Sequence, residues 1–218
     1  MDNYKKNLKL LTENHVYSKD MEHDACGVGV IASTEGKKSR EIVEYGIEAL
    51  KAVWHRGAVD ADGKTGDGAG IHVEIPKDFF IEKIENTGHK HDNSEVCVGM
   101  IFLPRNNYSA QEQCRTIIES VLTKKDFNIY GWRQVPVNPS VLGEKAEITR
   151  PEIAQVLFKH NDRSIIDKNL EVKLYEARRI IEKEASKNNL NNFYICSFSS
   201  KSIIYKGMFL AEALSDFY

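Results

Sequence analysis

Cys26 is the residue whose surroundings point most directly to chemistry. It stands between Ala25 and Gly27, so few atoms crowd its sulfur, and it opens an apolar run after a polar stretch. A cut after Ala25 would place a free α-amine on the residue that carries the thiol. A thiol has a pKa of about 8.5 and an α-amine about 7.7 to 8.0, so near neutral pH the amine can accept the thiol proton. Cys26 could then act as nucleophile and base together, although a lone cysteine in such a run is more often a buried structural thiol.

A cysteine nucleophile needs a charged group that anchors its substrate and donors that stabilise the oxyanion. Arg56, in the sequence His-Arg-Gly, carries a guanidinium, a group that can bind a carboxylate with two parallel hydrogen bonds. Taken alone, Arg56 would more simply form a surface ion pair. The glycine-rich stretch that follows carries three carboxylates, which either bind a cation or build a polar turn: Asp60, Asp62 and Asp67.

The elements that must position these residues are clustered strands with intervening helices, and they do not follow strict β-α-β alternation. Helical spacing predicts one buried face with Val43, Ile47, Leu50 and Trp54 after a cap at Ser39, and a capping box at 109–112 opens a helix that turns Cys114, Ile117, Ile118 and Val121 inward. Asp167 is expected to cap a third helix with Leu170, Leu174, Ala177 and Ile181 inside. Strands are expected at 26–33, 71–75, 96–103, 127–137 and 153–158, with a hairpin at 193–199 and 202–206. This order indicates an α+β fold with layered packing.

Composition excludes several classes of protein. The 218 residues carry 30 Lys plus Arg against 32 Asp plus Glu, so no basic excess favours nucleic acid. No apolar run approaches the roughly 18 to 20 residues that span a bilayer. The four cysteines lie too far apart for a zinc site or a disulfide scaffold, which suggests reduced thiols, no metal and a cytoplasmic location. The cysteines lie at 26, 97, 114 and 196.

The motifs around Cys26 and Arg56 occur in an order that resembles a known family. The chain is similar to the class-II glutamine amidotransferase domain of glutamate synthase, large subunit, over nearly all residues from about His23 onward. The segments that carry the resemblance are CGVGVIA (26–32), HRGA (55–58), DADGKTGDGAG (60–70), GWRQVP (131–136), FYICS (193–197) and YKG (205–207).

The resemblance implies an N-terminal nucleophile hydrolase fold, in which two antiparallel sheets lie between helix layers as an αββα sandwich. It implies that residues 1–25 are a propeptide and that residues 26–218 are the N-terminal portion of the domain. Cys26 would attack the side-chain amide of L-glutamine, and Arg56 would bind the α-carboxylate. Ammonia would pass to the remaining synthase domains, where FMN and an iron–sulfur cluster work, supplied with electrons in some cases by a small subunit. No cofactor is expected within this segment.

One departure from the family's pattern bears on activity. The family builds its oxyanion hole with an Asn-Gly pair, and no Asn-Gly dipeptide occurs between Cys26 and Tyr218. Loss of one oxyanion donor costs about 3 to 4 kcal/mol, so the isolated chain is expected to be nearly inactive. Two alternatives stay open: another N-terminal cysteine amidohydrolase of the acylase type, or a non-catalytic remnant or interaction module of the same fold. A redox role is a distant third, because no second cysteine lies near Cys26 in the sequence.

Overall fold

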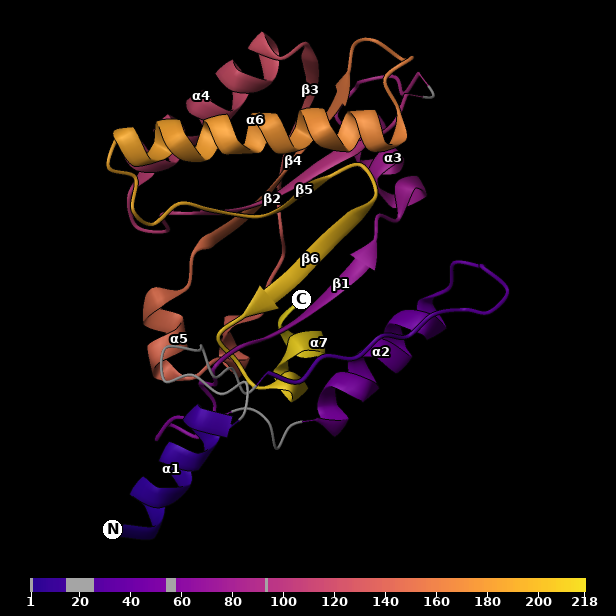
Figure 1. The fold of residues 1–218 in the computed structure, drawn as a ribbon. Helices are drawn as coiled ribbons and strands as arrows, with labels where there is room; N and C mark the ends of the chain where they lie inside the picture. The colour runs from indigo at the N-terminus through magenta and orange to yellow at the C-terminus, as the bar shows by residue number, and fades with distance from the viewer. Residues whose placement is uncertain (1, 15–25, 54–57, 93) are drawn as a thin grey trace.

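The computed structural model describes residues 2–14, 26–53, 58–92 and 94–218 (Figure 1). Its strands are β1 (Ala69–Glu74), β2 (Cys97–Leu103), β3 (Phe127–Gln134), β4 (Glu152–His160), β5 (Tyr194–Ser199) and β6 (Ser202–Gly207). Its α-helices are α1 (Asp2–Asn14), α2 (Arg40–Ala52), α3 (Lys77–Glu85), α4 (Tyr108–Lys124), α5 (Glu144–Thr149), α6 (Asp167–Lys187) and α7 (Leu214–Phe217). Two short 3₁₀ turns are η2 (Pro139–Val141) and η3 (Ala211–Ala213).

Four strands form the central sheet in the order β3-β4-β2-β5, with every pair antiparallel. All four strands lie where the sequence predicts them, although β3 ends at Gln134 rather than 137. β1 and β6 form a separate antiparallel pair. The predicted α+β class is confirmed to this extent: the chain mixes helices with antiparallel sheets.

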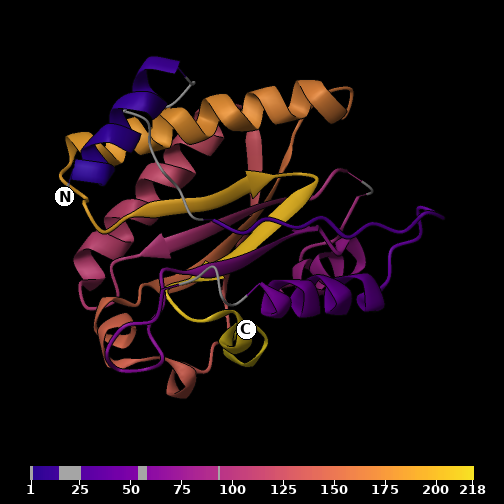
Figure 2. The same cartoon turned by 60° about the horizontal axis from the view of Figure 1, so that its bottom comes forward.

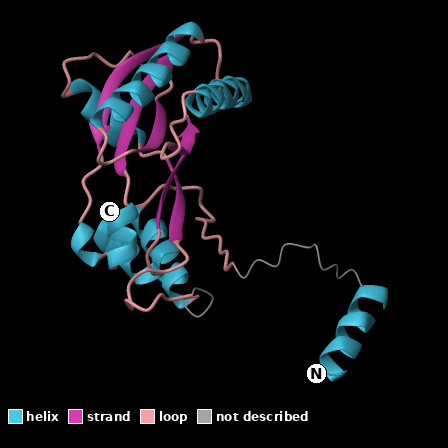
Figure 3. Cartoon of the chain, turned by 90° about the vertical axis from the view of Figure 1, so that its left-hand side faces the viewer, coloured by secondary structure: helices cyan, strands magenta, loops and turns pink. Residues whose placement is uncertain are grey.

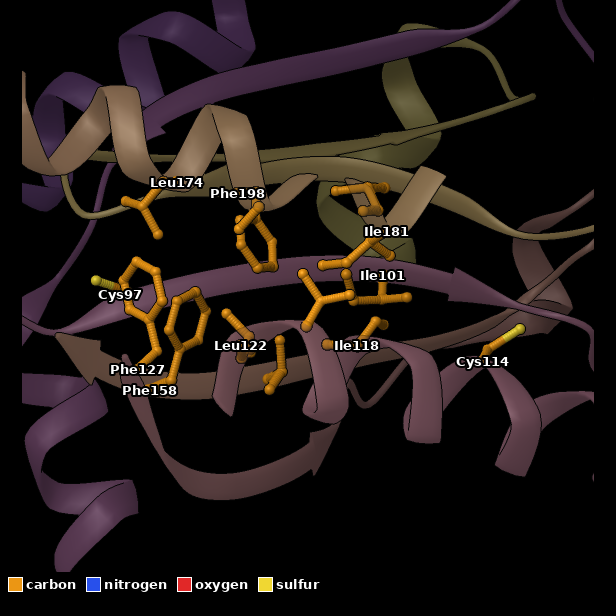
Figure 4. Close-up of a cluster of buried hydrophobic side chains, with 14 of the residues drawn as sticks. Cys97, Ile101, Cys114, Ile118, Leu122, Phe127, Phe158, Leu174, Ile181 and Phe198 are labelled. Atoms are coloured by element: carbon orange, nitrogen blue, oxygen red, sulfur yellow. The ribbon is translucent and has the colours of Figure 1, made fainter. Parts of the chain in front are cut away.

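Helices α4 and α6 cover one face of the central sheet (Figures 1 and 2). The inward side chains predicted for α6 are all buried, and those predicted for α4 are buried except Ile117, which is partly buried. They pack against alternate residues of the strands, among them Phe158 of β4 and Phe198 of β5, whose ring centroids lie 4.9 Å apart (Figure 4). Burying an aromatic or aliphatic side chain of this size contributes about 1.5–3 kcal/mol, so this layer supplies much of the fold's stability.

Two of the predicted helix caps are wrong. Asn107, not Ser109, caps α4, because its side chain accepts a hydrogen bond from the backbone N–H of Ala110 at 3.0 Å. Asn caps as well as Ser does, so the helix begins before the predicted box. Asp167 makes no capping hydrogen bond in α6, and its Oδ1 accepts instead from Lys201 Nζ at 3.0 Å. The cap at Ser39 is confirmed.

The β1–β6 pair lies on the other face of the central sheet, with α2 and the short C-terminal helices beyond it (Figure 3). α3 packs there as well, with Phe80 and Ile84 fully buried. The predicted face of α2 is correct in position but only half-buried, and Trp54 lies outside the described residues. Leu50 of α2 contacts this second core.

β5 and β6 do not form the predicted hairpin. They belong to different sheets, and a tight connection at Ser200 and Lys201 carries the chain from one sheet to the other. In place of a backbone hydrogen bond between the two strands, the Ser197 hydroxyl accepts a hydrogen bond from the Ile204 N–H at 3.2 Å. Because β6 pairs with β1 from the first part of the chain, the long-range ladder replaces the local one.

The predicted strand at 26–33 is also wrong. Residues 26–33 have no regular secondary structure, and Val28 and Val30 are 89% and 87% exposed. A strand needs a partner for its backbone hydrogen bonds, and no described strand pairs with this segment. A turn follows, closed by the Gly36 N–H on the Ser33 carbonyl at 3.2 Å, before α2 begins.

Candidate active site

Cys26 is exposed to solvent at the start of the segment that the structure describes from residue 26 onward. Arg56 lies outside the described residues, together with His55 and Gly57, so the structure does not test whether the two predicted site residues meet. The chain is described again from Ala58, two residues after Arg56. Ala58 and the loop that follows therefore carry the geometry of this region.

The root of the glycine-rich loop fixes Ala58 firmly. The Ala58 N–H donates to Asp67 Oδ2 at 3.1 Å, and the Asp67 N–H donates to the Ala58 carbonyl at 3.3 Å. Val59 and Gly66 then form an isolated antiparallel bridge inside this pair. Ala58, the residue that follows His-Arg-Gly, is thus held by two hydrogen bonds with Asp67 near the end of the loop, one donated and one accepted.

Asp62 organises the tip of this loop. Its Oδ1 accepts from the N–H groups of Lys64 and Thr65 at 2.9 and 2.7 Å, and its Oδ2 accepts from the Thr65 hydroxyl at 2.5 Å. These bonds, the Thr65 hydroxyl first, hold the pKa of Asp62 well below its usual range. Gly63 takes the left-handed conformation that the turn requires, with φ of 69°.

The three aspartates of the loop are engaged by protein donors. Asp60 pairs with Lys145 of α5 at 2.6 Å, which lowers the pKa of its carboxyl, while Asp62 and Asp67 bind the donors just described. Among the residues that the structure describes, no cluster of three or more His, Cys, Asp or Glu could hold a metal ion. Of the two interpretations left open by the sequence, this geometry favours the polar turn.

The loop docks against the start of α5. Gly143, which precedes α5, comes so close to the loop that an added Cβ would lie 2.7 Å from the Asp62 Cγ. The Asp60–Lys145 ion pair joins the loop to α5 at the same contact. The sequence DADGKTGDGAG therefore has a structural role, since its carboxylates attach the loop to a helix more than 75 residues later in the chain.

We expect the Gly143→Ala variant to lose stability. The Gly143 backbone, with φ −76° and ψ 163°, suits alanine, so only the clash with Asp62 and Thr65 opposes the methyl group. Overpacking of this kind costs about 1–3 kcal/mol. Urea unfolding of the 218-residue chain measures it, with Gly29→Ala as control because nothing lies within 4 Å of that Cβ. Equal midpoints for the two variants would show that the loop does not dock here.

A large cavity opens beside the end of the loop, with a volume of about 1150 Å³. Asp67, Gly68 and Gly70 line one side, and Tyr194 of β5 and Lys206 of β6 line another. Lys206 Nζ donates to the Tyr194 hydroxyl at 2.8 Å and stands 4.4 Å from the ring centroid. Cys26 is not among the residues that line this cavity.

A family comparison decides the identity of the chain. The model of the class-II glutamine amidotransferases matches residues 26–218. The chain belongs to this family. The match begins at Cys26 itself, the residue that chemical reasoning singles out.

Two relatives of this amidotransferase chain are named as glutamate synthases. The chain is 54% identical over 215 residues to the glutamate synthase [NADPH] large chain of Azospirillum brasilense. The matched region covers 99% of this chain and 14% of the relative. The chain is 39% identical over 214 residues to the ferredoxin-dependent glutamate synthase of Pyropia yezoensis, covering 96% of this chain and 14% of that protein. The chain thus spans about a seventh of the length of these relatives.

Cys26 differs from the other thiols of this amidotransferase. Cys97, Cys114 and Cys196 are buried, and Cys114 is one of the inward side chains predicted for its helix. Burial raises the pKa of Cys114 and of Cys196 to about 11, and it raises the pKa of Cys97 further. Near neutral pH these three thiols stay protonated and unreactive, so among the described residues Cys26 is the accessible thiol.

Sequence reasoning missed the residues that surround the loop. Gly143 and Lys145 carry no local sign of a contact with Asp60 and Asp62; the charge of Lys145 is the one sequence feature that could have suggested a pair with Asp60. Lys206 lies in the YKG segment that contributes to the family resemblance. Trp132 is partly buried, and its Nε1 donates to Glu119 Oε1 at 2.7 Å.

No described helix is both long and apolar enough to cross a membrane.

Proposed function

We propose that this chain performs the glutaminase half-reaction of a glutamate synthase, releasing ammonia from the side-chain amide of L-glutamine. The observation that carries the proposal is that the class-II glutamine amidotransferase match starts at Cys26, the exposed thiol. The names of the relatives support the same assignment. The acylase alternative has no comparable support.

The reaction starts once residues 1–25 are removed. The new α-amine of Cys26 takes the thiol proton, and Sγ attacks the amide carbon of glutamine. The tetrahedral intermediate collapses as the nitrogen is protonated and leaves as ammonia, which yields a γ-glutamyl thioester. Water, deprotonated by the same amine, attacks the thioester and releases glutamate and the thiol. No electrons are transferred, so this half-reaction requires no redox cofactor.

Arg56 is proposed to bind the α-carboxylate of glutamine. The hydrogen bonds between Ala58 and Asp67 support this role, because they fix the chain two residues beyond Arg56. A guanidinium binds a carboxylate with two parallel hydrogen bonds and thereby sets the direction of the substrate's side chain.

The layered arrangement of the sheets and helices also fits this function. We infer an αββα sandwich with residues 1–25 as a removable leader and residues 26–218 as the N-terminal part of the domain. The support comes from α4 and α6 on one face of the central sheet and the β1–β6 pair on the other, with α2 beyond it. In that sandwich the exposed side chains of Val28 and Val30 would be covered by a partner strand.

Ammonia is proposed to pass to synthase domains of the same polypeptide, where it meets 2-oxoglutarate, with electrons supplied in some relatives by a small subunit. We place FMN and the iron–sulfur cluster outside this chain. The cysteines support this for the cluster, because Cys97, Cys114 and Cys196 lie buried on β2, α4 and β5 and form no group that could hold metal. Reduced thiols and the composition fit a cytoplasmic enzyme.

The N-terminus and the thiol test this function together. We expect intact-mass measurement of the full-length enzyme to show a chain that begins at Cys26. A diazo-ketone analogue of glutamine should then alkylate Cys26 alone, and excess glutamine should slow the labelling. The Cys26→Ser variant is the control for the labelled position. An enzyme that keeps residues 1–25 and consumes glutamine, or one that is labelled elsewhere, would contradict the mechanism; an unlabelled enzyme would indicate the non-catalytic remnant.

A further inference from the structure

Two segments that carry the family resemblance meet at one buried side chain. Gln155, on β4 of the central sheet, is fully buried. Its Oε1 accepts from Arg133 Nη1 of the neighbouring strand β3 at 2.8 Å. Its Nε2 donates to the Tyr205 hydroxyl of β6 at 3.5 Å. The hydrogen-bonded side chains of Arg133, Gln155 and Tyr205 therefore link the central sheet with the β1–β6 pair.

The surroundings of Gln155 make an amide side chain costly unless it has partners. Ile153 and Leu157, two residues away on the same face of β4, are buried in the core between the sheets. An apolar side chain would suit this position, and a buried amide without hydrogen bonds costs about 1–3 kcal/mol. Both ends of the Gln155 amide are used, which indicates that the position serves the contact with Tyr205 and Arg133 rather than packing alone.

The strand that carries Tyr205 packs closely against the glycine-rich loop and the start of β1. Tyr205 lies opposite Ile71 in the β1–β6 ladder. Gly70 fits so closely that an added Cβ would stand 2.9 Å from the Tyr205 carbonyl oxygen. At the end of β6, a Cβ added to Gly68 would lie 3.2 Å from the Gly207 carbonyl oxygen. Just past β6, a Cβ added to Gly66 would lie 3.3 Å from the Phe209 backbone. The position of β6 thus sets the position of the loop.

The loop in turn holds the segment next to Arg56. Asp67 follows Gly66 and exchanges hydrogen bonds with Ala58, two residues after Arg56. We propose that Arg133, Gln155 and Tyr205 are positioning residues that place this segment and so set the affinity for the substrate's carboxylate. This inference rests on the proposed function for its kinetic part, but the coupling between Tyr205 and the loop does not.

Tyr205→Phe is the sharpest test, because it removes the hydroxyl and leaves Gln155 and Arg133 paired and the ring packed against Tyr218. In the full-length enzyme we expect the KM for glutamine to rise about two- to tenfold, the range that one hydrogen bond supplies, with kcat unchanged. Glutamate formation from added ammonia should not change. Amide hydrogen exchange at Ala58, Asp60 and Asp67 should become faster.

Tyr130→Phe is the matched control. Tyr130 is a buried tyrosine on β3, and its hydroxyl has no hydrogen-bond partner among the described residues. The same chemical change there should alter neither the KM nor the exchange of the loop. If both variants behave alike, the proposed coupling is overturned.

Variants of Gln155 separate positioning from packing. Gln155→Leu removes both hydrogen bonds and should raise the KM at least as much as Tyr205→Phe. In Gln155→Glu a carboxylate can accept from Arg133 and from the Tyr205 hydroxyl, so this variant should lie closer to wild type than Gln155→Leu. An equal KM for both Gln155 variants would contradict the positioning role.

The proposed function and this inference can fail separately. If Cys26→Ala keeps glutamine-dependent activity, the mechanism fails, while faster loop exchange in Tyr205→Phe would still support the coupling. If Cys26→Ala is inactive but loop exchange in Tyr205→Phe equals wild type, the mechanism stands and the coupling is wrong.

Discussion

Replacing Cys26 with alanine in the full-length enzyme should reduce glutamine-dependent glutamate formation at least about 10⁴-fold. In the proposed mechanism Cys26 supplies the attacking thiol, and the other described thiols are buried, which raises their pKa and keeps them protonated. Serine at this position keeps the amine but offers a far less acidic hydroxyl, and it should also be inactive. Steady-state assays at saturating glutamine measure the loss.

Two controls make the Cys26 result interpretable. Glutamate formation from added ammonia bypasses the glutaminase and should stay at the wild-type rate, which shows that the protein is folded. Cys114→Ala, a change of the same type in the core of α4, should leave the ratio of glutamine-dependent to ammonia-dependent rates unchanged. A Cys26→Ala enzyme that still hydrolyses glutamine at an appreciable rate would refute the mechanism.

Replacing Arg56 with methionine should raise the KM for glutamine about 10- to 150-fold. This range corresponds to the 1.5–3 kcal/mol typical of hydrogen bonds to charged groups. Lysine at position 56 keeps the charge but loses the two-pronged geometry, so its KM should fall between those of wild type and Arg56→Met. Initial rates over a wide range of glutamine concentrations give the KM and kcat of each variant.

A substrate analogue shows whether Arg56 contacts the carboxylate. 4-Aminobutanamide lacks the α-carboxylate of glutamine and should be a poor substrate for the wild type. Arg56→Met should use it no less well than wild type, because the contact is already absent. Arg40→Met, which removes an exposed arginine paired with Glu44 on α2, is the matched control. A further loss with the analogue in Arg56→Met would place Arg56 elsewhere in the mechanism.

Much of the fold could be predicted because its signals are local. The buried side of α6 repeats at helical spacing, and the run at 96–103 is almost wholly apolar, as a central strand requires. α3 was missed although Phe80 and Ile84 have helical spacing, because the helix after Pro76 is only nine residues long. Helix ends were less certain, since Asn107 and Ser109 are both good caps and only the packed helix decides between them.

The strand errors have a common cause. The pattern at 26–33 favours an extended chain, yet a strand exists only where another backbone supplies its hydrogen bonds, and none of the described strands does so. In the same way, β5 and β6 are neighbours in sequence, but β6 pairs with β1, more than 120 residues earlier. Local propensity cannot rank such competing partners.

The sequence by itself determined the family of the chain and the residues on which the proposed chemistry depends: a thiol that can share its residue with an amine, and an arginine in the His-Arg-Gly motif. These are properties of side chains and of neighbouring residues, so they can be recognised without coordinates. Only the tertiary structure decided how Asp60, Asp62 and Asp67 are used and that Gln155 joins Arg133 to Tyr205. Those contacts connect residues that lie far apart in the chain, and their existence depends on how the two sheets pack together.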